Sequence, residues 1–260
     1  WHSLTSQGYL NDSDSDLQDY IYQGLVDLVL HEVGHTLGLR HNFKASSIYT
    51  VEQLSDPKFT NQMGISGSVM DYHPVSLLDN GNSLFQIEPG PYDDWAIEYG
   101  YSQCSHTKGI LPAVYQDNQI PINNDNTCLE SIANRSNEPY LAYGTDEDAF
   151  GLSSRGIDPL CNVWDIGKDP VEFYDKQLDL VQKLWKNLID DFEKKGSRFQ
   201  KLRSVFSQGI GEYYSAYRTA AKFIGGIHFS RNHIGDPGQK NPLVVAVSYT
   251  HLTLPTNREV

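Results

Sequence analysis

The pattern of apolar and polar positions predicts a long helix near the start of the chain. Residues 1–16 are polar and include serine and aspartate side chains that can cap a helix. Apolar residues then recur at intervals of three or four, the spacing that gathers side chains on one helical face. The positions that carry this pattern are Leu17, Ile21, Leu25, Leu28 and Val29. We therefore expect one helix over residues 17–37.

The middle of the chain is expected to be rich in loops. Short helices are predicted at residues 51–54 and 92–99, the second beginning after a Pro-Gly-Pro sequence and ending at Gly100. Residues 102–165 are rich in Asn, Asp, Ser, Pro and Gly and show no sustained period, which is typical of loops.

A helical period returns after residue 169. The Asp-Pro pair at 169–170 is a typical helix start, and the apolar positions after it keep helical spacing: Val171, Tyr174, Leu178, Val181, Leu184 and Leu188. Residues 199–210 and 213–224 then indicate one or two further helices, with a break at Gly209 and Gly211.

The predicted first helix runs into the sequence HEVGHTLGLRH at residues 31–41. His31 and His35 lie one helical turn apart on the same face, so their imidazole nitrogens converge on one point. Gly38 lies where the helix should stop, because glycine adopts the left-handed conformation without steric cost. The chain can then turn back and bring His41 to the same point. Three protein ligands with an open fourth position are the pattern of catalytic zinc.

These residues resemble the metzincin clan of zinc peptidases, which share the extended histidine motif and a later methionine turn. The second part of that signature is present as SVMDY at residues 68–72. More closely, the chain is similar to a bacterial family of large zinc-dependent metalloproteases related to the enterotoxin-associated zincins. The similarity continues through YDDWAIEYGY, GTDEDA and CNVWDIGKDPVEFY, which begin at Tyr92, Gly144 and Cys161. It implies an exported bacterial protein, whether periplasmic, attached to the outer membrane or secreted.

The resemblance also implies roles for two residues of the methionine turn. Met70 would form an apolar floor beneath the three histidines. Tyr72 stands at the offset from which a tyrosine can approach the metal in some branches of the clan, where it would help to stabilise the oxyanion. The alternative for Tyr72 is a core tyrosine with a hydrogen-bonded hydroxyl. We expect His73 to line the wall of the site and not to bind the metal.

From the motif and the resemblance we predict a zinc-dependent endopeptidase that acts on proteins or peptides. One zinc ion held by His31, His35 and His41 would lower the pKa of its water towards about 7. Glu32, beside the metal, would take a proton from that water and pass it to the leaving amine. Two alternatives stay open: a non-peptidase zinc hydrolase, and a catalytically silent binding or adhesion module. The intact Glu32 favours an enzyme.

Composition excludes some other partners. The net charge of −13 argues against nucleic acid and anionic membranes, and no basic patch compensates for it. No apolar run approaches the roughly 20 residues that span a bilayer. Asp146-Glu147-Asp148 could supply oxygen ligands to calcium, although a solvated acidic turn is the favoured interpretation.

The cysteine pattern is compatible with an exported protein. Cys104, Cys128 and Cys161 lack the spacing of a metal site, and an oxidising compartment would permit one disulfide and one free thiol. The sequence leaves the pairing open.

We expect an α+β fold in which a zincin-like catalytic module precedes a mainly helical one. The catalytic module would span residues 1–103, a loop-rich connection 104–165 and the helical module 166–247. Residues 248–260 lack periodicity and resemble vector-derived read-through, with a natural disordered tail as the alternative. Because the sequence opens on Trp1 in a polar stretch, we expect an internal part of a longer protein. The zincin sheet, whose edge strand would bind extended substrate, would then lie upstream.

Overall fold

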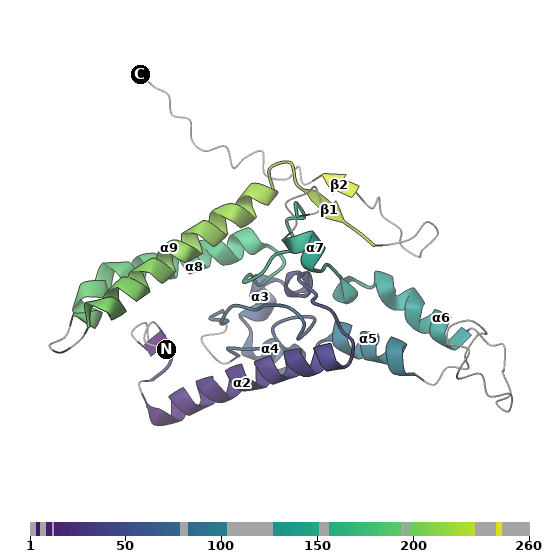
Figure 1. Ribbon diagram of the computed structural model, residues 1–260, viewed down its shortest axis with the longest axis horizontal. Helices are drawn as coiled ribbons and strands as arrows, with labels where there is room; N and C mark the ends of the chain where they lie inside the picture. The colour runs from purple at the N-terminus through teal and green to yellow at the C-terminus, as the bar shows by residue number, and fades with distance from the viewer. Residues whose placement is uncertain are drawn as a thin grey trace, which may run out of the picture.

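In its described part the chain folds mainly into helices, with one short hairpin after the last of them (Figure 1). The computed structural model describes residues 4–5, 9–11, 13–78, 83–102, 127–150, 156–193, 196, 198–231 and 243–245. The long helices are α2 (Asp14–Thr36), α8 (Pro170–Phe192) and α9 (Phe199–Lys222). Shorter helical segments lie between them: η1 (Ala45–Ile48), α3 (Val51–Leu54), α4 (Pro57–Met63), α5 (Pro91–Tyr101), α6 (Thr127–Ala133), η3 (Asn134–Asn137), η4 (Pro139–Leu141) and α7 (Asp146–Ala149).

The hairpin is small. It pairs β1 (Ile227–Phe229) with β2 (Leu243–Val245) in antiparallel register, with His228 opposite Val244. Among the described residues this is the only sheet, so the larger zincin sheet stays a prediction. Residues 248–260 lie outside the described part. Within that part no helix combines the length and the apolar character needed to cross a bilayer.

Helix α2 begins and ends close to where the sequence pattern places it. Ser13 caps its start by accepting a hydrogen bond from the Asp16 amide, and acidic side chains in the first turn complement the positive end of the helix dipole. After the other end, Gly38 adopts a left-handed conformation with φ of +90°. The prediction of one helix over residues 17–37 is confirmed, with its start at Asp14.

The main buried cluster joins residues far apart in the sequence. Tyr49, Leu54 and Ile65, from the segment after α2, pack with a group from the later part of the chain that comprises Ile166, Phe173, Tyr174 and Ala216. The two long C-terminal helices therefore pack directly on the segment that follows α2. The module boundaries at residues 103, 165 and 247 stay a prediction.

The short helices differ from the sequence expectation in three places. The expected helix at 51–54 is confirmed as α3, but α4 follows it, started by Asp56, which caps it, and Pro57. Helix α5 continues past Gly100, because the Ser102 amide still donates to the Glu98 carbonyl, so the expected end at Gly100 is wrong. Part of the region expected as loop holds short helices, from α6 to α7.

Helices α8 and α9 form an antiparallel pair that lies apart from α2 in Figure 1. Helix α8 begins at Pro170, with Asp169 as its cap, as predicted. Helix α9 is continuous, so the expected break at Gly209 and Gly211 is wrong. Gly209 is instead buried at the contact between the helices, where an added Cβ would lie 2.7 Å from the Trp185 ring. That ring also stacks on Phe206 and on Tyr213.

This packing predicts opposite effects for two neighbouring glycines. Gly209→Ala should lower the free energy of unfolding by about 1–3 kcal/mol, the usual cost of overpacking a close contact. Gly211→Ala is the matched control, because an added Cβ there has no neighbour within 4 Å. It should raise stability by about 0.5–1 kcal/mol through helix propensity alone. Urea denaturation of both variants checks this, and equal shifts would contradict the contact.

Candidate metal centre

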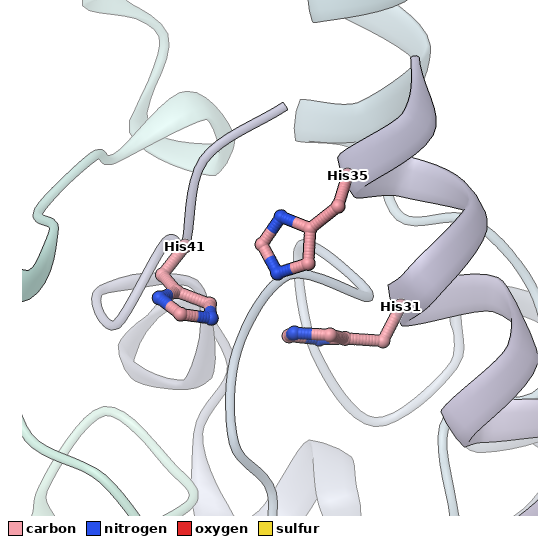
Figure 2. A group of neighbouring side chains, drawn as sticks. All are labelled: His31, His35 and His41. Carbon is pink, nitrogen blue, oxygen red and sulfur yellow. The ribbon is translucent and has the colours of Figure 1, made fainter. Parts of the chain in front are cut away.

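Three histidines meet at the C-terminal end of α2. His31 and His35 project from one face of the helix, and His41 faces them from the segment that follows (Figure 2). One ring nitrogen of each lies within 4.8 Å of the others, and this is the only group of three or more candidate metal ligands found among the described residues. The sequence prediction that these three side chains converge is therefore confirmed.

The turn after α2 brings His41 into place. The Leu39 amide donates to the Gly34 carbonyl at 3.0 Å, which closes the helix end around the left-handed Gly38. A side chain at Gly38 would meet no neighbour within 4 Å, so the constraint there is backbone conformation and not space. The Phe43 ring stacks on His41 at 5.0 Å between centres and is fully buried, which anchors the returning chain.

Each histidine uses its Nδ1 atom in a hydrogen bond outside the cluster. His31 Nδ1 lies 2.7 Å from the Val69 carbonyl, and His35 Nδ1 lies 3.0 Å from the Leu39 carbonyl. Because a carbonyl only accepts, both Nδ1 atoms carry the proton and both Nε2 atoms keep a free lone pair. This arrangement, in which a second partner fixes the tautomer, is typical of zinc-binding histidines, so the donor set fits zinc.

Burial favours the neutral form of His31. It lowers the pKa of this imidazole, and the proximity of His35 and His41 lowers it further, although the Val69 hydrogen bond acts in the opposite direction. A neutral ring at pH 7 is the form that binds a metal.

The third partner is Asp146, which the sequence suggests only as a possible calcium ligand and not as part of the zinc site. Its Oδ1 atom lies 2.9 Å from His41 Nδ1 and so orients the third ring. Burial raises the pKa of Asp146, but the hydrogen bond and charge of His41, together with the hydrogen bond from Thr145, lower it by more, so the net pKa is lowered. The one available signal was the GTDEDA sequence, which the resemblance singles out without assigning a role.

The acidic cluster is a single helical turn whose Asp146 and Glu147 side chains are 42% and 49% exposed, which agrees with the favoured interpretation of a solvated acidic turn. It forms α7, and each of its carboxylates has a partner: Asp146 pairs with His41, Glu147 with Arg40 at 3.0 Å, and Asp148 with Arg231. The pairing with cations leaves less negative charge for a calcium ion, which stays an untested prediction.

Met70 packs directly beneath the helix that carries the histidines. It is fully buried, and an added Cβ on Gly34 would lie 2.3 Å from its sulfur atom. Glycine between the two histidines of α2 thus lets the methionine approach the helix backbone.

The methionine turn is held by a carboxylate from α5. Asp93 accepts hydrogen bonds from the Ser68 hydroxyl and, at 2.8 Å, from the Val69 amide. The Val69 carbonyl in turn holds His31. Helix α5 therefore positions a candidate ligand through the turn.

Tyr72 lies against the cluster. Its hydroxyl is 3.0 Å from His41 Nε2, and its ring stacks on Trp164. Burial raises the pKa of Tyr72, and the negative charges of Asp146 and Glu32 raise it further, so both carboxylates act on this hydroxyl. Glu32 itself is exposed on α2 beside His31.

His73 and the cysteines lie outside the cluster. His73 is buried, with Nδ1 3.9 Å from an Asp27 oxygen, and does not join the three histidines. Cys128 is disulfide-bonded, whereas Cys161 is buried and free. Cys104 lies outside the described residues.

Comparison with known proteins gives one match. A family model described as Met-zincin matches residues 13–250, which include the three histidines, the methionine turn and α7. No curated protein and no solved structure matches significantly.

The Asp146 contact predicts a measurable effect on metal affinity. Asp146→Asn should weaken zinc binding by about 10–100-fold, because the partner that orients His41 loses its charge. Glu147→Gln is the matched control, since Glu147 lies in the same helix and pairs with Arg40 instead. Competition against a chromophoric chelator measures both affinities. Equal zinc affinity in the two variants would show that Asp146 does not support the ligand.

Proposed function

Because the chain belongs to the Met-zincin family, we propose that it is a zinc-dependent endopeptidase in which Glu32 is the general base. The observation that carries the proposal is the donor set. Three converging histidines have their Nδ1 atoms engaged elsewhere, so their Nε2 lone pairs are the donors for one zinc ion. The His41 Nε2 lone pair accepts from the Tyr72 hydroxyl in this structure and would exchange that hydrogen bond for the metal. Bound zinc supplies a Lewis acid that polarises a peptide carbonyl and acidifies water.

Glu32 moves the proton in this proposal. It follows His31 directly, so its carboxylate stands beside the metal position on the solvent side of α2. There it accepts a proton from the attacking water and donates it to the nitrogen of the leaving amine. The exposed position of Glu32 keeps this carboxylate accessible to substrate.

Tyr72 stabilises the negative charge that develops on the carbonyl oxygen. Its hydroxyl lies 3.0 Å from His41 Nε2 and is therefore close to any group held at the cluster. A fixed hydroxyl donor at this place acts as part of an oxyanion hole. Met70 and Gly38 support the site by packing under α2 and by ending it.

The disulfide at Cys128 supports the expected export of the protein, because structural disulfides persist in oxidising compartments. The Met-zincin family favours a protein or peptide as the substrate.

Replacement of Glu32 tests the assignment of the base. Glu32→Gln should keep one zinc per chain and lower kcat/KM by about 10²–10⁴-fold, the usual contribution of a general base. Glu52→Gln, an exposed glutamate on α3, is the control and should retain activity. Cleavage of a fluorogenic peptide library, with zinc content by mass spectrometry, measures both. Wild-type turnover in zinc-loaded Glu32→Gln would exclude this base.

Replacement of Tyr72 separates its catalytic role from a core role. Tyr72→Phe should lower kcat by about 10²–10³-fold with little change in KM, because the hydroxyl acts only as charge develops. Tyr22→Phe, an exposed tyrosine of α2, should leave kcat unchanged. If Tyr72→Phe changes thermal stability but not kcat, the hydroxyl belongs to the core.

A further inference from the structure

A cavity of about 250 Å³ lies between α9, residues 149–150 and residues 162–164. Aromatic residues and two cations line it: Phe150, Trp164, Tyr174, Tyr214, Arg218 and Lys222. The expected site residues do not include any of these side chains.

Two of the residues that line this cavity, Trp164 and Phe150, are each separated from His41 by one intervening aromatic ring. Trp164 stacks on Tyr72, with ring centres 5.6 Å apart, and Tyr72 contacts His41 at 4.8 Å. On a second path Phe150 contacts Phe43 at 5.4 Å, and Phe43 stacks on His41 at 5.0 Å. The cavity is thus next to the metal centre and shares its aromatic wall.

Trp164 is held in place between the two sites. Its φ of +64° is in the left-handed region, which is costly for a bulky residue and is stable only when the surroundings impose it. Two hydrogen bonds hold this conformation. The Trp164 amide donates to the Tyr72 carbonyl at 2.9 Å, and the Tyr174 hydroxyl donates to the Trp164 carbonyl at 3.2 Å. Its side chain nevertheless stays accessible, because the residue is 55% exposed.

The cavity also presents two cations, Arg218 and Lys222, in a chain that is acidic overall. The sequence carries 33 acidic and 20 basic residues, yet Arg218 has no ion pair within the described part of the chain. Lys222 donates to the Cys161 carbonyl at 2.8 Å. Burial lowers the pKa of Lys222 and the nearby charge of Arg218 lowers it further, while Asp165 and Asp158 act in the opposite direction. A carboxylate beside Arg218 would offset the repulsion between the charges of Arg218 and Lys222. It would also accept charge-assisted hydrogen bonds from Arg218.

We propose that this cavity binds a carboxylate of the peptide substrate through Arg218, close to the scissile bond, and so sets the specificity of the enzyme. An extended peptide advances about 3.3–3.6 Å per residue, so the cavity is within reach of a group two to four residues from that bond. The aromatic walls pack against the aliphatic part of the same residue. The carboxylate comes from an Asp or Glu side chain or from the free C-terminus of the substrate. This inference rests on the proposed peptidase function.

The test compares matched peptides on matched variants. Peptides of one sequence carry Glu or Gln at each position two to four residues from the cleaved bond, and each is made with a free or an amidated C-terminus. The enzymes are the wild type, Arg218→Gln, and the control Arg203→Gln, which removes the same charge from an exposed position of α9 outside the cavity. The wild type should cleave the carboxylate-bearing peptide about tenfold faster in kcat/KM. That ratio should fall to about one in Arg218→Gln and persist in Arg203→Gln.

A preference for the Glu peptide over the Gln peptide would identify a side-chain carboxylate. A preference for the free C-terminus over the amidated one would identify the C-terminal carboxylate. Cleavage without either preference, or a preference that survives in Arg218→Gln, would overturn the cavity assignment and leave the peptidase proposal standing. The same peptides are also titrated by fluorescence anisotropy against Glu32→Gln, with and without Arg218→Gln. Carboxylate-dependent binding that needs Arg218, without cleavage by the wild type, would retain the cavity and contradict the peptidase. Absence of both cleavage and carboxylate-dependent binding would overturn both.

Discussion

The hydrogen bond between His31 Nδ1 and the Val69 carbonyl joins the two halves of the candidate metal centre. It fixes the tautomer of His31 and ties α2 to the methionine turn. The turn itself is set by Asp93 of α5, which accepts from the Val69 amide. The backbone of Val69 thus links α5 to His31, because its amide bonds Asp93 and its carbonyl bonds the histidine. The close approach of Met70 to Gly34 requires that the same turn lie against the helix backbone.

The second support of the site comes from the later part of the chain. Asp146 orients His41 from α7, and Trp164 donates its amide to the Tyr72 carbonyl while its ring covers the Tyr72 ring. Because α8 and α9 pack on the core beneath these segments, the helical part of the chain contributes to the shape of the site. The candidate metal centre therefore depends on residues that lie far along the chain from the short histidine motif.

The sequence predicts what depends on local spacing. The histidine triad follows from offsets of four and six residues and a glycine between them, and the long helices follow from their apolar period. Asp146 could not be found this way, because it lies 105 residues from His41 and reads locally as an acidic turn. Gly209 shows the same limit of local sequence patterns, because here the pattern predicts a break that the structure does not have. A glycine in a helix indicates a break until its neighbour Trp185 is known, and then it indicates close packing.

The central claim is that three histidines hold one zinc ion which the chain uses to hydrolyse peptides. The most direct measurement is the metal content of the purified protein by mass spectrometry, made together with cleavage of a mixed peptide library before and after chelation. The account predicts one zinc per chain and cleavage that is lost with the chelator and restored by added zinc. Protein that retains no zinc when the metal is supplied, or cleavage that the chelator does not affect, would contradict it.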